Sequence, residues 1–234
     1  MEASNFGVSA LGVRADCLKM KTMTDKLPIS IEDVTEAAKV LDGQIERTPM
    51  RHSKTLSEIT GAEVWVKFEN LQFTAAFKER GALNKLARLT DDQKTAGIVA
   101  ASAGNHAQGV AFMCKHFGVH GVIFMPITTP QQKVMKTQMF GGTHVEVRLT
   151  GDYFDDTLAS AQAFCADAGA HFLSPFDDED VIEGQASVAV EIEAQLGHAP
   201  DHIILPVGGG GLSAGTRSYF EDRTRYTFVD PSGA

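Results

Sequence analysis

Hydrophobic positions along the chain follow two alternating spacings. From residue 30 onward, segments with apolar residues every three or four positions, typical of amphipathic helices, alternate with short apolar runs typical of buried strands. Ser30 followed by Asp33 resembles a capping box, and Pro130 can open a helix because the first turn does not need its missing amide. We expect a first helical region that begins at residue 31 and ends by Thr48-Pro49, and a short helix around 56–59. Further helices are expected at 78–89, 106–117, from 130 onward, 154–168, 181–196 and 212–222. We expect strands at 64–68, 98–101, 122–125, 144–147, 171–173, 202–207 and 226–229.

Strands that alternate with helices over the whole length predict an α/β fold with parallel sheets, covered by helices on both faces. In such folds, ligands bind at the carboxyl ends of strands, where loops lead into helices. Three loops of this kind carry small, hydrogen-bonding or reactive residues, namely 70–78, 102–106 and 208–211. These loops are the candidate binding site.

Composition and charge exclude several classes of partner. The 234 residues are 43% hydrophobic and 22% charged, which is ordinary for a soluble protein. A net charge of −9 argues against nucleic acid or an anionic membrane surface as partner. No apolar run approaches the roughly 20 residues needed to cross a bilayer. Three scattered cysteines fit a reducing cytoplasm, with Cys114 and Cys165 expected as buried small hydrophobic residues.

The glycine loop is a candidate anion site. Four glycines, Gly208, Gly209, Gly210 and Gly211, follow an apolar strand and precede a helix that starts near Leu212. Backbone amides in such a loop can converge on a phosphate, and the helix N-terminus adds about half a positive charge. No Gly-Lys-Ser/Thr follows, so the loop is not a Walker P-loop. A plain glycine turn is the alternative without a ligand.

The same glycines leave a second ligand class open. Gly209, Gly211 and Ala214 fit the G-x-G-x-x-A spacing of dinucleotide-binding loops. Asp230 lies about twenty residues on, at the end of an expected strand, where a ribose-binding acid would sit. On this loop alone, a nicotinamide-dependent oxidoreductase therefore competes with a phosphate site.

The other two loops carry the candidate reactive groups. Lys78 lies at the first turn of a helix, where a cation is disfavoured, and this predicts a neutral or covalently engaged amine. A solvated surface lysine is the alternative. The loop from Ser102 to His106 suits a carboxylate, which backbone amides and a hydroxyl can bind. Its alternative is a simple helix cap made by Ser102 or Asn105.

Taken in this order, the three loops resemble those of the pyridoxal-phosphate enzymes of fold type II, the tryptophan synthase β-like family, and within it the threonine dehydratases. The resemblance covers about residue 27 to the end and implies two three-layer parallel-sheet domains, the larger one incomplete. It implies a larger cofactor-binding domain at 27–73 and 176–234 and a smaller domain at 74–175. The segments that carry it are 67–72 (KFENLQ) leading into 77–82 (FKERGA), 102–109 (SAGNHAQG) and 206–212 (PVGGGGL), with 128–133 and 174–177 between them.

The resemblance implies a role for each loop. Lys78 would carry pyridoxal 5'-phosphate and act as the base that removes the substrate Cα proton. Phe77 would flank the cofactor, and Asn105 would hydrogen-bond the phenolic oxygen of its ring. The phosphate would bind Gly208, Gly209, Gly210, Gly211 and the amide of Leu212, while Ser102, Ala103, Gly104, Asn105 and His106 form the substrate-carboxylate loop.

The implied reaction converts L-threonine, and possibly L-serine, to a 2-oxoacid and ammonia, in isoleucine biosynthesis or in threonine breakdown. Serine racemases of the family have a second serine where this chain has Ala103, which cannot transfer a proton, so elimination is favoured over racemisation. A racemase-like enzyme, the nicotinamide-dependent enzyme and an inactive remnant stay as alternatives. The chain also departs from many members at Ala75-Ala76, where they have Gly-Ser.

Further expectations concern the ends of the chain and its assembly. Residues 1–26 are expected to be a disordered tail or a misassigned start. The family continues beyond Asp230-Pro231, so the chain is expected to end inside the catalytic domain and to be poorly soluble or inactive alone. Relatives are usually dimers or tetramers, so a homo-oligomer is expected. No metal site is expected, because no HExxH or clustered Cys/His motif accompanies the histidines.

Overall fold

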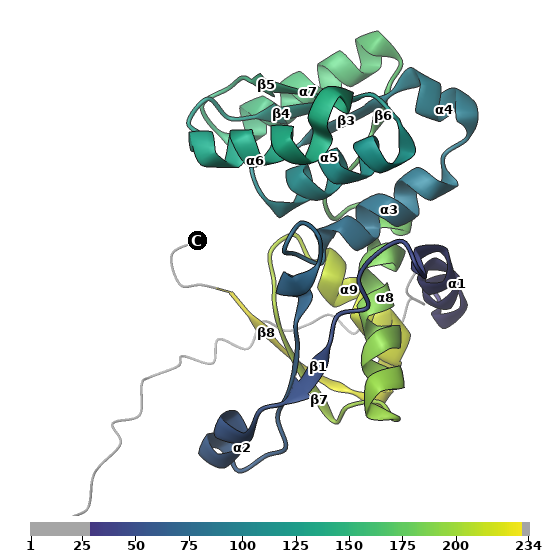
Figure 1. Cartoon of the computed structure of the whole chain (residues 1–234), viewed down its shortest axis with the longest axis vertical. Coiled ribbons are helices and arrows are strands. Elements are labelled where there is room, and N and C mark those ends of the chain that lie inside the picture. Colours follow the sequence, from purple (N-terminus) through teal and green to yellow (C-terminus); the bar gives the residue numbers. More distant parts are fainter. Residues whose placement is uncertain (1–28, 231–234) are drawn as a thin grey trace, which may run out of the picture.

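The computed structural model describes residues 29–230, so the prediction for residues 1–26 lies outside the described residues. Figure 1 shows a helix-covered sheet above, and the strand pairs β1-β2 and β7-β8 with helices α1, α8 and α9 below. The helices are α1 (Ile31–Leu41), α2 (Lys54–Thr60), α3 (Lys78–Arg88), α4 (Asp91–Ala96), α5 (Asn105–Phe117), α6 (Gln131–Gly141), α7 (Phe154–Ala168), α8 (Glu179–Leu196) and α9 (Gly211–Phe220). The strands are β1 (Met50–His52), β2 (Trp65–Lys67), β3 (Ile98–Ala101), β4 (Gly121–Met125), β5 (Val145–Leu149), β6 (His171–Phe172), β7 (His202–Pro206) and β8 (Arg225–Val229). Short 3-10 turns are η1 (Glu69–Leu71), η2 (Gly142–His144) and η3 (Glu221–Arg223).

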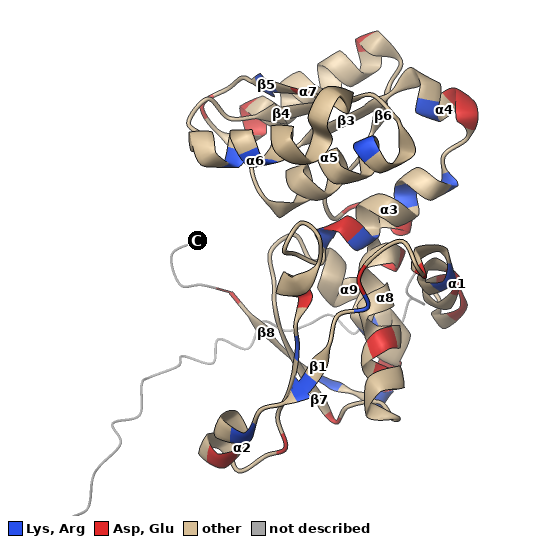
Figure 2. Cartoon of the chain, viewed as in Figure 1, with Lys and Arg blue, Asp and Glu red and all other residues tan. Residues whose placement is uncertain are grey.

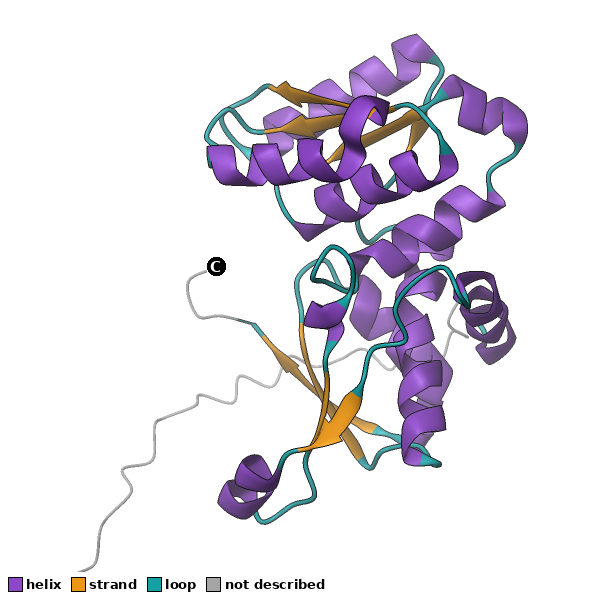
Figure 3. Cartoon of the chain, viewed as in Figure 1, coloured by secondary structure: helices purple, strands orange, loops and turns teal. Residues whose placement is uncertain are grey.

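The largest sheet is parallel, with strand order β5-β4-β3-β6, and helices cover both of its faces, as Figure 3 shows. Side chains alternate along β3 and β4, because successive residues of a strand point to opposite faces. Ala100 and Ile123 pack in one core cluster with residues of α3 and α5, whereas Val99 and Val122 pack in another with residues of α7. The predicted three-layer α/β arrangement is confirmed for this sheet.

The remaining strands correct two expectations. β1 and β2 pair antiparallel, not parallel, because the intervening segment with α2 turns the chain back on itself. β7 and β8 are parallel, but this pair is not covered on both faces, since Ile204 is 70% exposed and Phe228 51% exposed. Strand β1 and helix α4 were not expected, and the first helix ends at Leu41 with Asp42 as its cap, several residues before Thr48.

Four glycines let the helices around Lys78 approach closely. A Cβ on Gly184 of α8 would lie 2.6 Å from the Arg80 carbonyl oxygen, and one on Gly81 would lie 2.6 Å from the Val181 carbonyl oxygen. A Cβ on Gly109 of α5 would lie 3.1 Å from the Glu79 amide nitrogen, and Gly215 of α9 meets α8 in the same way. Helix α3 is therefore held by backbone contacts on two sides.

Charged residues of both signs occur on the described helices, but single helices often carry only one sign. Helices α1 to α4 carry both acidic and basic residues, whereas α8 carries acidic residues alone and α6 basic residues alone, as Figure 2 shows. Within residues 29–230, no helix is both long and apolar enough to span a bilayer. Cys114 and Cys165 are buried and free, as predicted. The domain boundaries expected from the sequence stay a prediction.

Candidate active site

Lys78 is the first residue of α3, and its side chain is partly buried. The Lys78 Nζ donates a hydrogen bond to the Pro175 carbonyl oxygen at 2.7 Å and lies 5.4 Å from the centre of the Phe77 ring. Burial lowers the pKa of Lys78, because the ammonium form loses hydration. Lys78 is therefore not a fully solvated surface lysine, and its partial burial favours the neutral amine that a nucleophile needs.

The loop from Ser102 to His106 follows β3 and opens α5. The Ser102 hydroxyl accepts the Gly104 amide at 3.2 Å, before the helix begins, and no described side chain caps α5 itself. Asn105 is exposed at the first helical position, and Ala103 packs against the main core cluster. The simple-cap alternative is therefore not what the structure has, and the first-turn amides of α5 are left for an anionic ligand.

His106 is only 3% exposed, and its ring is turned toward the segment after β6. The His106 Nε2 lies 3.1 Å from the Leu173 carbonyl oxygen, an acceptor, so Nε2 carries the proton. Burial lowers the pKa of His106 to about 3, which keeps the ring neutral. Because the ring is bonded to Leu173, His106 can offer a substrate carboxylate its backbone amide but not this N–H.

The glycine loop runs from the end of β7 into α9. Gly210 has a φ of +86°, a conformation that glycine adopts without strain, and α9 starts at Gly211 without a described side-chain cap. Leu212 is the second residue of the helix, and Gly208 and Gly209 are exposed. The Ser213 Oγ is buried and has no hydrogen-bond partner within residues 29–230. Free first-turn amides beside an unpartnered hydroxyl fit a phosphate.

The segment Leu173–Phe176 connects the three loops. Its Leu173 carbonyl accepts the His106 ring N–H, and its Pro175 carbonyl accepts the Lys78 amine. The Phe176 ring lies against Gly209, where an added Cβ would come within 2.1 Å of it. Residues 174–177 contributed to the resemblance, but sequence reasoning assigned this segment no role. Its place after β6, the strand beside β3, is the signal that could have found it.

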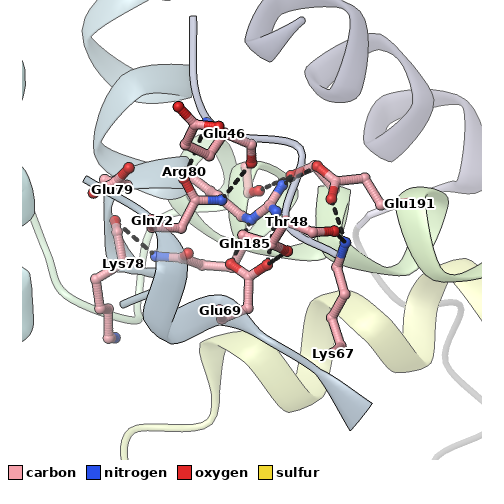
Figure 4. A network of polar contacts seen from close by, with 12 residues as sticks. Glu46, Thr48, Lys67, Glu69, Gln72, Lys78, Glu79, Arg80, Gln185 and Glu191 are labelled. Carbon is pink, nitrogen blue, oxygen red and sulfur yellow. Dashed lines mark hydrogen bonds and ion pairs between the residues drawn. The ribbon is translucent and has the colours of Figure 1, made fainter. Parts of the chain in front are cut away.

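A buried ionic cluster lies beneath the start of α3, and sequence reasoning missed it. Arg80 donates two hydrogen bonds of 2.8 Å to Glu69, one from Nε and one from Nη2, and a third of 2.7 Å to Glu191. Although burial opposes the charge, these bonds raise the pKa of Arg80. Figure 4 shows Lys78 pointing away from this cluster, with the Gln185 amide 3.4 Å from the Lys78 carbonyl oxygen. The cluster anchors α3 and does not engage the Lys78 amine.

The donor set fits pyridoxal phosphate better than the other candidates. A partly buried amine of lowered pKa can bond the aldehyde, and the glycine loop can bind the phosphate. Asp230 does follow β8 beside β7, as a dinucleotide site would need, but that interpretation leaves Lys78 and α5 without a role. No group of three His, Cys, Asp or Glu residues among those described could hold a metal ion.

Comparisons with known proteins agree with this donor set. The family model described as "Pyridoxal-phosphate dependent enzyme" matches residues 41–234. The L-threonine dehydratase biosynthetic IlvA of Corynebacterium glutamicum is 45% identical over 212 residues, which are 88% of this chain and 49% of that protein. The chain thus spans about half the length of the curated relatives it matches.

Solved structures give the same fold. The processed form of threonine deaminase isoform 2 from Solanum lycopersicum has a TM-score of 0.79 and 36% identity, covering 87% of this chain and 55% of that one. Serine racemase from Dictyostelium discoideum has a TM-score of 0.81 and 30% identity, covering 88% and 67%. The predicted fold class and resemblance are confirmed. Because the family match spans well over half of the chain, the protein belongs to the pyridoxal-phosphate-dependent enzymes.

Proposed function

We propose that this chain forms the catalytic core of a threonine dehydratase, which converts L-threonine to 2-oxobutanoate and ammonia in isoleucine biosynthesis. The observation that carries the proposal is the partly buried Lys78 amine, joined through Pro175 and Phe176 to a glycine loop suited to a phosphate. The 45% identity to a biosynthetic threonine dehydratase supports the substrate. L-serine, which also has a β-hydroxyl, is the second candidate substrate.

Each loop has a chemical task in this proposal. Gly208–Gly211 and the Leu212 amide bind the cofactor phosphate, and the first-turn amides of α5 bind the substrate carboxylate. Asn105 would hydrogen-bond the ring oxygen of the cofactor. Pyridoxal phosphate, when bound, supplies an electron sink for the carbanion at the substrate Cα.

Lys78 performs the proton transfer. With pyridoxal phosphate bound, the Lys78 amine would take the substrate Cα proton, and the burial that lowers the pKa of Lys78 favours the neutral form that this transfer needs. Loss of this proton together with the β-hydroxyl removes water from threonine. Hydrolysis of the C–N bond then gives the 2-oxoacid and ammonia.

Ala103 supports elimination over racemisation, despite the similar fold of serine racemase. Racemisation needs a second proton-transferring group on the opposite face of the substrate, and a methyl side chain cannot provide one. We also propose that the enzyme acts on a small amino-acid substrate in the cytoplasm. It would form a homo-oligomer, either a dimer or a tetramer.

The test uses cofactor trapping followed by turnover. We expect the purified protein to show a visible absorption band of lysine-bound cofactor, and borohydride reduction to leave a pyridoxyl group on Lys78, located by mass spectrometry of peptides. Lys78→Ala should abolish 2-oxobutanoate formation from threonine, whereas Lys54→Ala, on an exposed surface position, should retain it. An adduct at another lysine, or bound nicotinamide nucleotide instead, contradicts the proposal.

A further inference from the structure

Glu79 follows Lys78 directly, and its side chain is fully buried at 0% exposure. Its carboxylate faces the preceding loop of residues 73–77. Glu79 Oε1 accepts the Phe73 amide at 3.1 Å, and Glu79 Oε2 accepts the Thr74 amide at 2.7 Å and the Thr74 hydroxyl at 2.6 Å. All three partners are donors, so the arrangement requires acceptor oxygens on both sides of the carboxyl group.

The loop that Glu79 holds is strained. Ala75 has a φ of +61°, a left-handed conformation that costs an L-residue roughly 1–2 kcal/mol. Before it, Gln72 is bonded to the backbone of Glu46, and after it Phe77 leads directly into α3. Ala75 therefore lies between the anchored residue Thr74, which Glu79 holds, and the start of α3, and Gln72 provides a further anchor before Thr74.

The surroundings of Glu79 leave it this single task. It takes no part in the ionic cluster of its neighbour Arg80, whose partners are Glu69 and Glu191. Gly109 of α5 lies behind its backbone, so the start of α3 cannot move in that direction. Burial raises the pKa of Glu79, although the Thr74 and Phe73 donors and the Arg80 charge lower it, so the carboxylate is held here against a desolvation cost.

We propose that Glu79 is a positioning residue, whose buried carboxylate holds the strained loop of residues 73–77 and so sets where the Lys78 amine and the Phe77 ring lie. The link to cofactor chemistry rests on the proposed function; the effect on the Lys78 amine does not. Two bonds lead from Glu79 to the loop backbone, and the loop enters α3 at the residue before Lys78.

The main test measures the Lys78 amine without cofactor. Competitive labelling with acetic anhydride over a pH series, read by peptide mass spectrometry, gives the pKa of each lysine. Glu79→Gln keeps the shape but replaces one acceptor oxygen with a donor, so at least one side of the clamp is lost. We expect the Lys78 pKa to rise toward its ordinary value as the loop opens to water, and a rise of one unit lowers labelling at neutral pH about tenfold. An unchanged or lower pKa overturns the proposal.

Other charged groups near the amine must stay the same for this comparison. His106 of α5 faces Lys78 and remains neutral, while Arg80 lies on its own helix within the ionic cluster. Glu183→Gln is the matched control, because Glu183 is a buried carboxylate of α8 bonded to Arg88, away from the loop. It should leave the Lys78 pKa unchanged, and an equal rise in this variant would reduce the Glu79 effect to general loosening and overturn the proposal.

Two further variants separate positioning from stability. Thr74→Val removes only the hydroxyl donor and should shift the Lys78 pKa in the same direction by less, which keeps the proposal testable if Glu79→Gln fails to fold. Ala75→Gly relieves the strain at this position, so the loop needs less support from Glu79. In the Glu79→Gln background, Ala75→Gly should therefore bring the Lys78 pKa part of the way back down toward its wild-type value. Purely additive effects of Ala75→Gly on stability, without any recovery at Lys78, contradict positioning. Cofactor trapping at a lysine other than Lys78 would instead refute the proposed function and leave this result intact.

Discussion

The buried histidine of α5 makes the stability of the protein depend on pH in a way that one substitution can isolate. His106 has an ordinary pKa of 6.5, and burial lowers it to about 3 in the folded protein. Between these pH values, His106 is protonated in the unfolded chain but neutral in the folded protein. Stability is therefore complete above pH 6.5 and falls as the pH drops below it.

The size of the effect follows from the gap between pH and the unfolded pKa. At pH 5.0 this gap is 1.5 units, and each unit corresponds to about 1.36 kcal/mol, so His106 alone removes about 2 kcal/mol of unfolding free energy relative to pH 7.5. The folded pKa hardly enters this value as long as it lies below about 4. His106→Gln keeps an N–H donor for the Leu173 carbonyl but does not titrate.

The assay is urea unfolding at pH 7.5, 6.0 and 5.0, followed by circular dichroism at low protein concentration. The wild type should lose about 2 kcal/mol more than His106→Gln over this range, because the carboxylates contribute equally to both. His198→Gln, at an exposed position, should keep the wild-type dependence. Equal pH slopes in the wild type and His106→Gln would refute the reasoning that His106 is buried and neutral.

Three further predictions concern the residues around the site. Ala75→Gly should raise the free energy of unfolding by roughly 0.5–1 kcal/mol, because the relief of strain at a φ of +61° outweighs the added freedom of the unfolded chain. Ala76→Gly should lower the free energy of unfolding, because the φ of Ala76 is not positive. Equal effects of the two variants in urea unfolding would contradict this reasoning. Lys78→Met should stabilise the cofactor-free protein near pH 7, since the folded protein disfavours the ammonium form of Lys78. The gain in stability should shrink as the pH rises toward 10.5, where the unfolded chain also loses this proton. A loss of stability at pH 7 would contradict this prediction. Gly209→Ala should lower the free energy of unfolding by about 1–3 kcal/mol, because its Cβ would meet the Phe176 ring at 2.1 Å. Gly208→Ala should leave stability nearly unchanged, because no atom lies within 4 Å of its Cβ. Similar melting behaviour of the two variants would show that Phe176 moves aside freely.

The elements that the sequence predicted well are those with their own local signal. The helix of α7 matches its expected range of 154–168, and β3 matches 98–101, because both have long or continuous apolar patterns. Helix α4 has six residues, too few for a periodic apolar face, although Thr90 does form a capping box with Gln93. Pairing direction is not a local property, and the antiparallel β1–β2 pair depends on where the α2 segment returns the chain.

In the candidate site, too, the features with a local sequence signal could be predicted and the tertiary contacts could not. Lys78 and the two loops could be found because reactive and glycine-rich residues stand beside helix starts in the sequence. The contacts that join them could not, since a carbonyl such as that of Pro175 is a property of the backbone and carries no residue signature. Glu79 was equally hidden, because a glutamate in the first turn of a helix is ordinarily explained by the helix dipole.

The glycine contacts around α3 bear on how the protein can vary. Since Gly81 and Gly184 bring backbone against backbone, the spacing between α3 and α8 at these positions is set by main-chain contact and not by large apolar side chains. Volume-conserving exchanges at core positions such as Leu83 or Leu86 should be tolerated, whereas even alanine at these glycines would push the lysine-bearing helix outward. In a saturation-mutagenesis map, the sharpest intolerance outside the site itself should therefore fall on residues that have no side chain at all.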